Sequence, residues 1–172
     1  MSKSETVIKD LQTRNLRYAS EKASIFPKFV KGQNPNIIVL TCSDSRVIPE
    51  YIFKKNIGEI FTIRVAGNVA IDPSIVSSLE YAVDHFDIDL LIIMGHTNCG
   101  AIAAAEKDQK GKLLAEIRRS FPYNKNHVLA NLNRQIEMLP KRSKIIAKAI
   151  KDNKIKLVGA IYEIENRIVN FL

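Results

Sequence analysis

The chain reads Asn36-Ile37-Ile38-Val39-Leu40-Thr41-Cys42-Ser43-Asp44-Ser45-Arg46 at a point where an apolar run gives way to reactive polar side chains. Residues 36–41 are mostly apolar and β-branched and follow a turn-rich segment, which predicts a short buried strand. Residues 59–65 and 89–94 have the same character and predict two further strands. All three runs are short enough to be buried strands of one sheet.

Helical periodicity fills most of the chain around these strands. We expect helices over residues 4–26, 74–86, 100–107 and 125–151, the first closed by Pro27 and the last interrupted at Pro140. Residues 156–164 and 167–171 predict a C-terminal hairpin. Short strands that alternate with helices predict right-handed crossovers, and hence an α/β fold with a mainly parallel sheet.

Length and composition indicate a single globular domain. The chain has 172 residues, 46% of them hydrophobic, and its N-terminus lacks an apolar signal region. The apolar runs at 37–40 and 90–94 are far shorter than the roughly 18 residues that a membrane span needs. We therefore expect one domain over 1–172, with residues 1–30 as an N-terminal helical arm, in the cytoplasm and without a membrane partner.

The positive charge is concentrated in one segment. The chain has a net charge of +8, and residues 107–156 hold 14 Lys and Arg against 4 Asp and Glu. A basic zinc protein that binds nucleic acid is therefore an alternative. A solvated surface is favoured, because like charges usually face water and the segment has only Phe121 and Tyr123 as aromatic residues.

Candidate metal ligands follow two of the predicted strands. Cys42 comes directly after the first, and the third ends in Gly95-His96-Thr97-Asn98-Cys99-Gly100. Ligands gather at the carboxyl ends of parallel strands, so Cys42, His96 and Cys99 can converge. Two thiolates and an imidazole suit Zn²⁺, and three protein ligands leave a coordination position open for chemistry. His85 and His127 lack ligand spacing, so one catalytic zinc per chain is favoured.

Asp44 and Arg46 lie two and four residues after Cys42. In an extended stretch the three side chains share a face. A carboxylate paired with a guanidinium stays ionised and can accept a hydrogen bond from zinc-bound hydroxide. A purely structural salt bridge is the alternative interpretation.

Taken together, these residues resemble the β-class carbonic anhydrases. The resemblance rests on the segment Cys42–Arg46 and the segment Gly95–Gly100 about fifty residues later. It extends over nearly the whole chain through four further segments, Gln33-Asn34-Pro35, Phe61-Thr62-Ile63-Arg64-Val65-Ala66-Gly67-Asn68, Ser78-Leu79-Glu80-Tyr81-Ala82-Val83 and Gly159-Ala160-Ile161-Tyr162.

The resemblance implies a fold, an assembly and a set of roles. It implies a four-stranded parallel core with an added C-terminal strand, and a homodimer, or a larger dimer-based assembly, in which the N-terminal helix wraps the neighbouring subunit. Cys42, His96 and Cys99 correspond to the zinc ligands, and Asp44 and Arg46 to the catalytic pair. The implied carbon dioxide pocket at the subunit interface contains Gln33, Phe61, Ala66, Tyr81 and Gly100.

The implied activity is the reversible hydration of CO₂ to bicarbonate and a proton by attack of zinc-bound hydroxide. Zinc lowers the pKa of bound water from about 15.7 to about 7 in carbonic anhydrases with three histidine ligands, and two thiolates should hold it higher. His85, four residues after Tyr81, matches a proposed proton route of plant-type members. Hydrolysis of a CO₂ analogue such as CS₂ on the same scaffold is a further alternative.

Overall fold

The N-terminal unit of the chain is a lone helix with a short turn after it. The protein is described by a computed structural model that covers residues 2–172 and divides into two units, the first ending at Gln33. Helix α1 (Lys3–Lys22) starts with a capping box, in which Ser2 and Glu5 satisfy each other's backbone amides. It ends four residues before the predicted boundary, and Pro27 lies in a separate 3₁₀ turn, η1 (Phe26–Phe29). No residue of α1 is buried.

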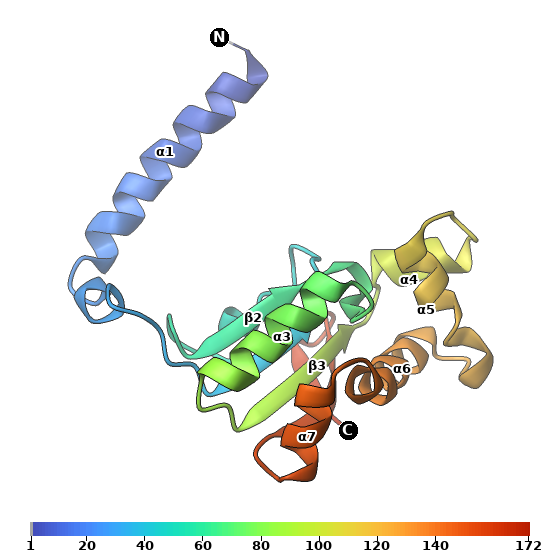
Figure 1. Ribbon diagram of the computed structural model, residues 1–172. Coiled ribbons are helices and arrows are strands. Elements are labelled where there is room, and N and C mark those ends of the chain that lie inside the picture. The colour runs from blue at the N-terminus through green and yellow to red at the C-terminus, as the bar shows by residue number, and fades with distance from the viewer. Residues whose placement is uncertain (1) are drawn as a thin grey trace. The chain divides into compact units, whose positions relative to one another are not determined.

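The second unit, Asn34–Leu172, is built on a five-stranded sheet (Figure 1). The strands are β1 (Ile37–Thr41), β2 (Ile60–Arg64), β3 (Leu90–His96), β4 (Lys156–Glu163) and β5 (Ile168–Phe171). They lie in the sheet in the order β2-β1-β3-β4-β5. The first four strands pair in parallel and β5 pairs antiparallel with β4. The predicted four-stranded parallel core with an added C-terminal strand is confirmed.

Alternate residues of β1 face two different apolar cores. Ile38 and Leu40 pack with residues of three helices, α3 (Pro73–His85), α6 (His127–Arg142) and α7 (Lys144–Lys151). Figure 1 shows α3 crossing in front of β2 and β3 on this face. Val39 points to the other face, where the short helix α2 (Pro49–Ile52) and the C-terminal hairpin contribute the cover. The first strand is therefore buried on both faces, as its uninterrupted apolar run predicts.

A third apolar cluster lies at the carboxyl ends of β1 and β3. It contains Cys42 and Cys99 together with Ile102 of α4 (Gly100–Glu106) and Ile117 of α5 (Lys112–Arg118). Helix α5, the 3₁₀ turn η3 (Phe121–Tyr123) and α2 lie outside the predicted elements.

The C-terminal helical segment breaks at a different residue from the predicted one. Pro140 lies inside α6, and the break falls at Ser143, whose backbone is extended. The Ser143 hydroxyl caps α7 by accepting the Ile146 amide and donates to Glu80 of α3. Ser143 therefore ends one helix and starts the next, while Pro140, only two residues before the end of α6, is tolerated there.

None of the helices in residues 2–172 has the length and apolar character that crossing a membrane would require.

Helices α5 and α6 meet around a buried carboxylate. Glu116 has no exposed side-chain surface and forms ion pairs with Arg119, Arg134 and Arg142 at 2.9, 3.0 and 2.5 Å. Burial raises the pKa of Glu116, but the hydrogen bonds from Arg142, Arg134 and Arg119 outweigh it and hold this pKa below its ordinary value. The carboxylate is thus stabilised in its ionised form in the interior.

Because of this cluster, the free energy of unfolding should depend on pH. Since the pKa of Glu116 is lower in the folded than in the unfolded protein, its contribution is complete above the unfolded pKa of about 4.3 and is lost as the pH falls through the folded value. Glu116→Gln leaves three guanidinium groups without their anion and should cost about 3 kcal/mol at pH 7. Urea unfolding should show this difference shrinking below pH 4.

The matched control is Glu137→Gln on α6, where the carboxylate is exposed and paired only with Lys141. An exposed pair contributes about 0.5 kcal/mol or less. Equal losses in the two variants, or a Glu116→Gln deficit that stays constant down to pH 3, would contradict the assignment.

Candidate metal centre

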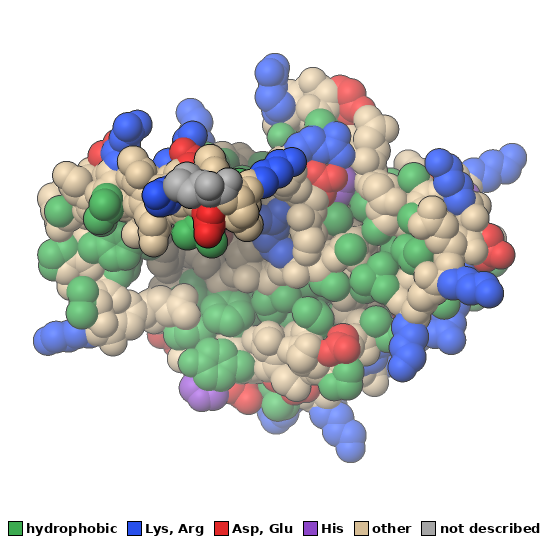
Figure 2. All heavy atoms as spheres, turned by 90° about the horizontal axis from the view of Figure 1, so that it is seen from above, with side chains coloured by type: hydrophobic (Ala, Val, Ile, Leu, Met, Phe, Trp, Pro, Cys, Tyr) green, Lys and Arg blue, Asp and Glu red, His purple; other side chains and the backbone are tan. Residues whose placement is uncertain are grey.

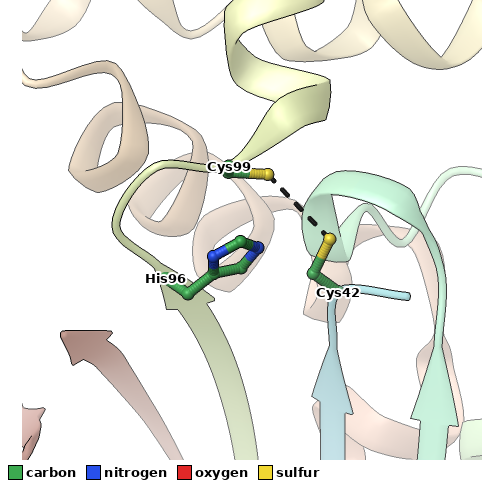
Figure 3. Close-up of side chains that lie close together, drawn as sticks. All are labelled: Cys42, His96 and Cys99. Atoms are coloured by element: carbon green, nitrogen blue, oxygen red, sulfur yellow. Dashed lines mark hydrogen bonds between the residues drawn. The ribbon is translucent and has the colours of Figure 1, made fainter. Parts of the chain in front are cut away.

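Cys42, His96 and Cys99 converge at the carboxyl ends of the two central strands (Figure 3). Their potential ligand atoms all lie within 4.8 Å of one another, and all three side chains are buried. Strands β1 and β3 are neighbours in register, with Thr41 beside Met94. The residues that follow these two positions therefore meet, as the sequence predicts.

The donor atoms fit a zinc ion. The two sulfurs are 3.9 Å apart, too far for a disulfide, and both cysteines are free. Two zinc–sulfur bonds of 2.3 Å at the tetrahedral angle place their sulfurs about 3.8 Å apart. His96 Nδ1 lies 2.8 Å from the Thr97 carbonyl oxygen and donates to it, so Nε2 carries the lone pair. That Nε2 is buried without a hydrogen-bond partner, which is the state expected of a metal ligand.

The electrostatics favour a thiolate at Cys42. The Cys99 thiol donates a hydrogen bond to the Cys42 sulfur and lowers the pKa of Cys42 to about 4, although burial acts in the opposite direction. His96 and the backbone amides of Gly67 and Asp44 lower this pKa further. The same contact with Cys42, together with burial, raises the pKa of Cys99. The two sulfurs therefore share one proton, which a bound cation would displace.

Asp44 is held beside His96 by Arg46. Its carboxylate accepts three hydrogen bonds from Arg46, from Nε at 2.9 Å, Nη2 at 2.8 Å and the backbone amide at 3.0 Å. Asp44 Oδ2 lies 3.9 Å from His96 Nε2, on the side of the ring that carries the free lone pair. The guanidinium of Arg46 holds the pKa of Asp44 far below its usual range. An ionised carboxylate is thus fixed against the ligand cluster.

Two loops fix this arrangement, and sequence reasoning did not identify either contact. The Gly67 amide, in the 3₁₀ turn η2 (Ala66–Asn68), donates to Cys42 Sγ at 3.3 Å. On the other side, Glu165 accepts hydrogen bonds from the Thr97 hydroxyl at 2.8 Å and from the Asn98 amide at 2.6 Å. Glu165 therefore holds the turn between His96 and Cys99.

The predicted pocket residues lie in separate places. Phe61, Tyr81 and His85 are close together, with Tyr81 stacked on His85 at 4.1 Å and 6.3 Å from Phe61 between ring centroids. Phe61 lies beside Ile38 in the sheet, so about 13 Å of strand separates it from the level of Cys42. These aromatic residues are thus remote from the metal ligands of their own chain.

The other three predicted pocket residues differ in position. Ala66 begins η2 and precedes Gly67, whose amide donates to Cys42 Sγ, and Gly100 begins α4 directly after Cys99. Gln33 is the last residue of the N-terminal unit.

The remaining histidine does not join the cluster. His127 Nδ1 lies 2.8 Å from Glu106 and the His127 ring stacks on Phe121. In residues 2–172, Cys42, His96 and Cys99 form the one group of three or more metal-binding side chains that lie close together. Three protein ligands, rather than four, are available.

All four acidic residues of the basic segment form ion pairs within it, which leaves its excess of ten positive charges unchanged. Three arginines pair with Glu116, Arg118 with Asp108, Lys141 with Glu137 and Lys148 with Asp152. Figure 2 shows Lys and Arg side chains at many places on one face of the molecule, with Asp and Glu side chains among them. The solvated surface favoured by the sequence therefore stays a prediction.

Comparison with known proteins identifies the family. The family model described as carbonic anhydrase matches residues 37–169. Carbonic anhydrase 2 of Mycobacterium tuberculosis is 30% identical over 156 residues, which cover 78% of this chain and 73% of that protein. A β-carbonic anhydrase of Aspergillus fumigatus superposes with a TM-score of 0.82 at 25% identity, over 99% of this chain and 91% of that one.

A similar match comes from the tetrameric β-carbonic anhydrases of Sordaria macrospora. The matched chain has a TM-score of 0.83 at 25% identity, over 98% of this chain and 97% of that one. This chain therefore belongs to the carbonic anhydrase family, and to its β class.

Proposed function

We propose that this carbonic anhydrase hydrates CO₂ reversibly with one Zn²⁺ per chain, held by Cys42, His96 and Cys99. The observation that carries the proposal is the convergence of two free sulfurs and an unpartnered imidazole nitrogen next to an ionised carboxylate. When bound, zinc supplies a Lewis acid that activates water as a nucleophile at neutral pH.

The chain's own residues orient the nucleophile. Asp44 has no proton to donate, so it accepts a hydrogen bond from the nucleophile. This hydrogen bond orients the nucleophile so that one of its lone pairs points away from Asp44. Arg46 keeps Asp44 in place, and its Nη2 also donates to the Asn98 carbonyl at 3.2 Å. Asp44 and Arg46 thus act as one unit that is anchored to the ligand turn.

The pocket is completed by a second copy of the chain. Phe61 and Tyr81 lie about 13 Å along the sheet from the ligands of their own chain, and Tyr81 is 48% exposed. Helix α1 has no buried residue, although it carries apolar side chains that are more than half exposed, Val7, Ile8, Leu11 and Leu16. We infer a homodimer in which these surfaces are covered and Gln33, Phe61 and Tyr81 serve the partner's site.

Removal of one ligand tests the function itself. The wild type should contain one equivalent of zinc and hydrate CO₂. Cys99→Ser should lose both the zinc and the activity, because the two remaining side chains, Cys42 and His96, do not retain the ion. Metal analysis and a stopped-flow pH-indicator assay measure the two quantities. Zinc below half an equivalent in carefully purified wild type, or full zinc in Cys99→Ser, would exclude the site.

Arg46→Ala separates metal binding from turnover. Without its guanidinium, Asp44 is free to move onto the metal and occupy the position that the nucleophile needs. The variant should keep its zinc and lose at least 10²-fold in kcat/KM. Arg118→Ala, which breaks the ion pair with the exposed Asp108, is the control for loss of an arginine. Unchanged turnover in Arg46→Ala would contradict the role of this pair.

Mixed dimers test whether the pocket is shared. A Cys99→Ser chain lacks a metal site and a Gln33→Ala chain lacks a donor for a CO₂ oxygen, a loss of about 10²-fold. If each pocket combines the ligands of one chain with Gln33 of the other, a mixed dimer regains one intact site. Activity should therefore rise on mixing. If mixed dimers form without such a rise, the pocket belongs to a single chain.

A further inference from the structure

A chain of buried polar side chains leads from Glu116 to the Cys42 ligand. Asn131 and Gln135 lie four residues apart on α6 and are 1% and 0% exposed. Neither side chain belongs to the metal cluster. Buried amides are costly unless all their hydrogen bonds are made, so their presence in the core calls for a role.

In this series of buried side chains, each group donates a hydrogen bond to the next one toward Cys42. Arg142, which can only donate, is paired with Glu116 and donates to Gln135 Oε1 at 3.2 Å and to the Ala70 carbonyl at 2.7 Å. The Ala70 amide also donates to Gln135 Oε1, at 3.0 Å. Both contacts fix this oxygen as an acceptor, so the Gln135 amide nitrogen must face Asn131.

The direction is transmitted to the loop beside the metal site. Gln135 Nε2 donates to Asn131 Oδ1 at 3.2 Å, which leaves Asn131 Nδ2 to donate to the Gly67 carbonyl at 2.8 Å. Gly67 in turn donates its own amide to Cys42 Sγ at 3.3 Å. Gly67 has a φ of +68°, and a Cβ there would lie 2.7 Å from Ile117 Cδ1. The residue is thus held from both sides in a conformation that suits glycine.

We propose that Asn131 and Gln135 are positioning residues for the metal site, and that they act by holding the Gly67 amide on the Cys42 sulfur. A hydrogen bond to a ligating thiolate reduces the negative charge that it donates to the metal and fixes the orientation of the sulfur. This inference rests on the proposed metal site. It extends that site from three ligands to a buried support on α6, which ends at the Glu116 cluster.

The direct test needs no substitution. In ¹⁵N-labelled protein loaded with ¹¹³Cd²⁺, the Gly67 amide proton should show scalar coupling to the metal through the Cys42 sulfur, as detected by NMR. A wild type that binds cadmium and hydrates CO₂ with zinc but shows no Gly67 coupling overturns this inference alone. A wild type that binds neither metal overturns the proposed function and this inference with it.

Variants on α6 then test the support. Asn131→Leu keeps the branched shape of the side chain and removes the donor to Gly67. Gln135→Glu keeps the acceptor for Ala70 and Arg142 but has no donor for Asn131. Each should abolish the Gly67 coupling, weaken zinc binding 10- to 100-fold in a chelator competition, and shift the thiolate-to-cobalt charge-transfer band of the Co²⁺ form to longer wavelength.

Asn133→Leu is the control, because Asn133 is exposed on the same helix. It should leave zinc affinity and the cobalt band unchanged. Wild-type affinity and an unshifted band in both Asn131→Leu and Gln135→Glu would show that the two amides serve the stability of the core alone and would overturn the proposal.

Discussion

The parallel pairing of β1 with β3 is the constraint on which the site depends. Because Thr41 and Met94 are partners in the centre of the sheet, Cys42 must lie at the same edge as His96 and Cys99. The strands themselves are held by apolar cores on both faces, where Leu40 on one face and Met94 on the other have no exposed surface. The ligand geometry is thus set by the most buried part of the fold, and little conformational entropy remains to be lost when a metal binds.

The edge of the sheet beyond these strands is unusually polar for a protein interior. Thr41, Asn68, His96, Glu116, Asn131 and Gln135 are all buried there or in the helices that pack against it. Most of their hydrogen bonds are made within the chain, and the two exceptions among residues 2–172 are His96 Nε2 and Asn68 Nδ2. Such a network costs stability unless it is complete. The part of the network that reaches Cys42 through Asn131 and Gly67 supports the proposed positioning role.

The sequence was sufficient for the strands, for the convergence of Cys42, His96 and Cys99 and for the Asp44–Arg46 pair, because each depends on local pattern or on strand order. Apolar runs identify buried strands, and parallel order brings their carboxyl ends together. The extent of α1 and the break at Ser143 were harder to predict, since they depend on turn chemistry and on a contact with Glu80. Helix α5, between the predicted elements, was not predicted.

The contacts that hold Cys42, His96 and Cys99 in place could not be predicted from the sequence. Gly67, Glu165 and Asn131 reach the site from distant segments, and nothing in the spacing of residues distinguishes a buried amide on α6 from an exposed one. Asn131 and Asn133 differ by two positions and have opposite environments. The sequence also did not reveal that three arginines of the basic segment surround the single buried carboxylate of Glu116.

The central claim is that these three side chains form a zinc site with an open position. X-ray absorption at the zinc edge of the purified protein tests it most directly. The account predicts two sulfur scatterers at about 2.3 Å, one imidazole nitrogen at about 2.0 to 2.1 Å and one further light atom from a non-protein ligand. A zinc shell without sulfur, or one with four sulfurs shared between chains, would contradict it.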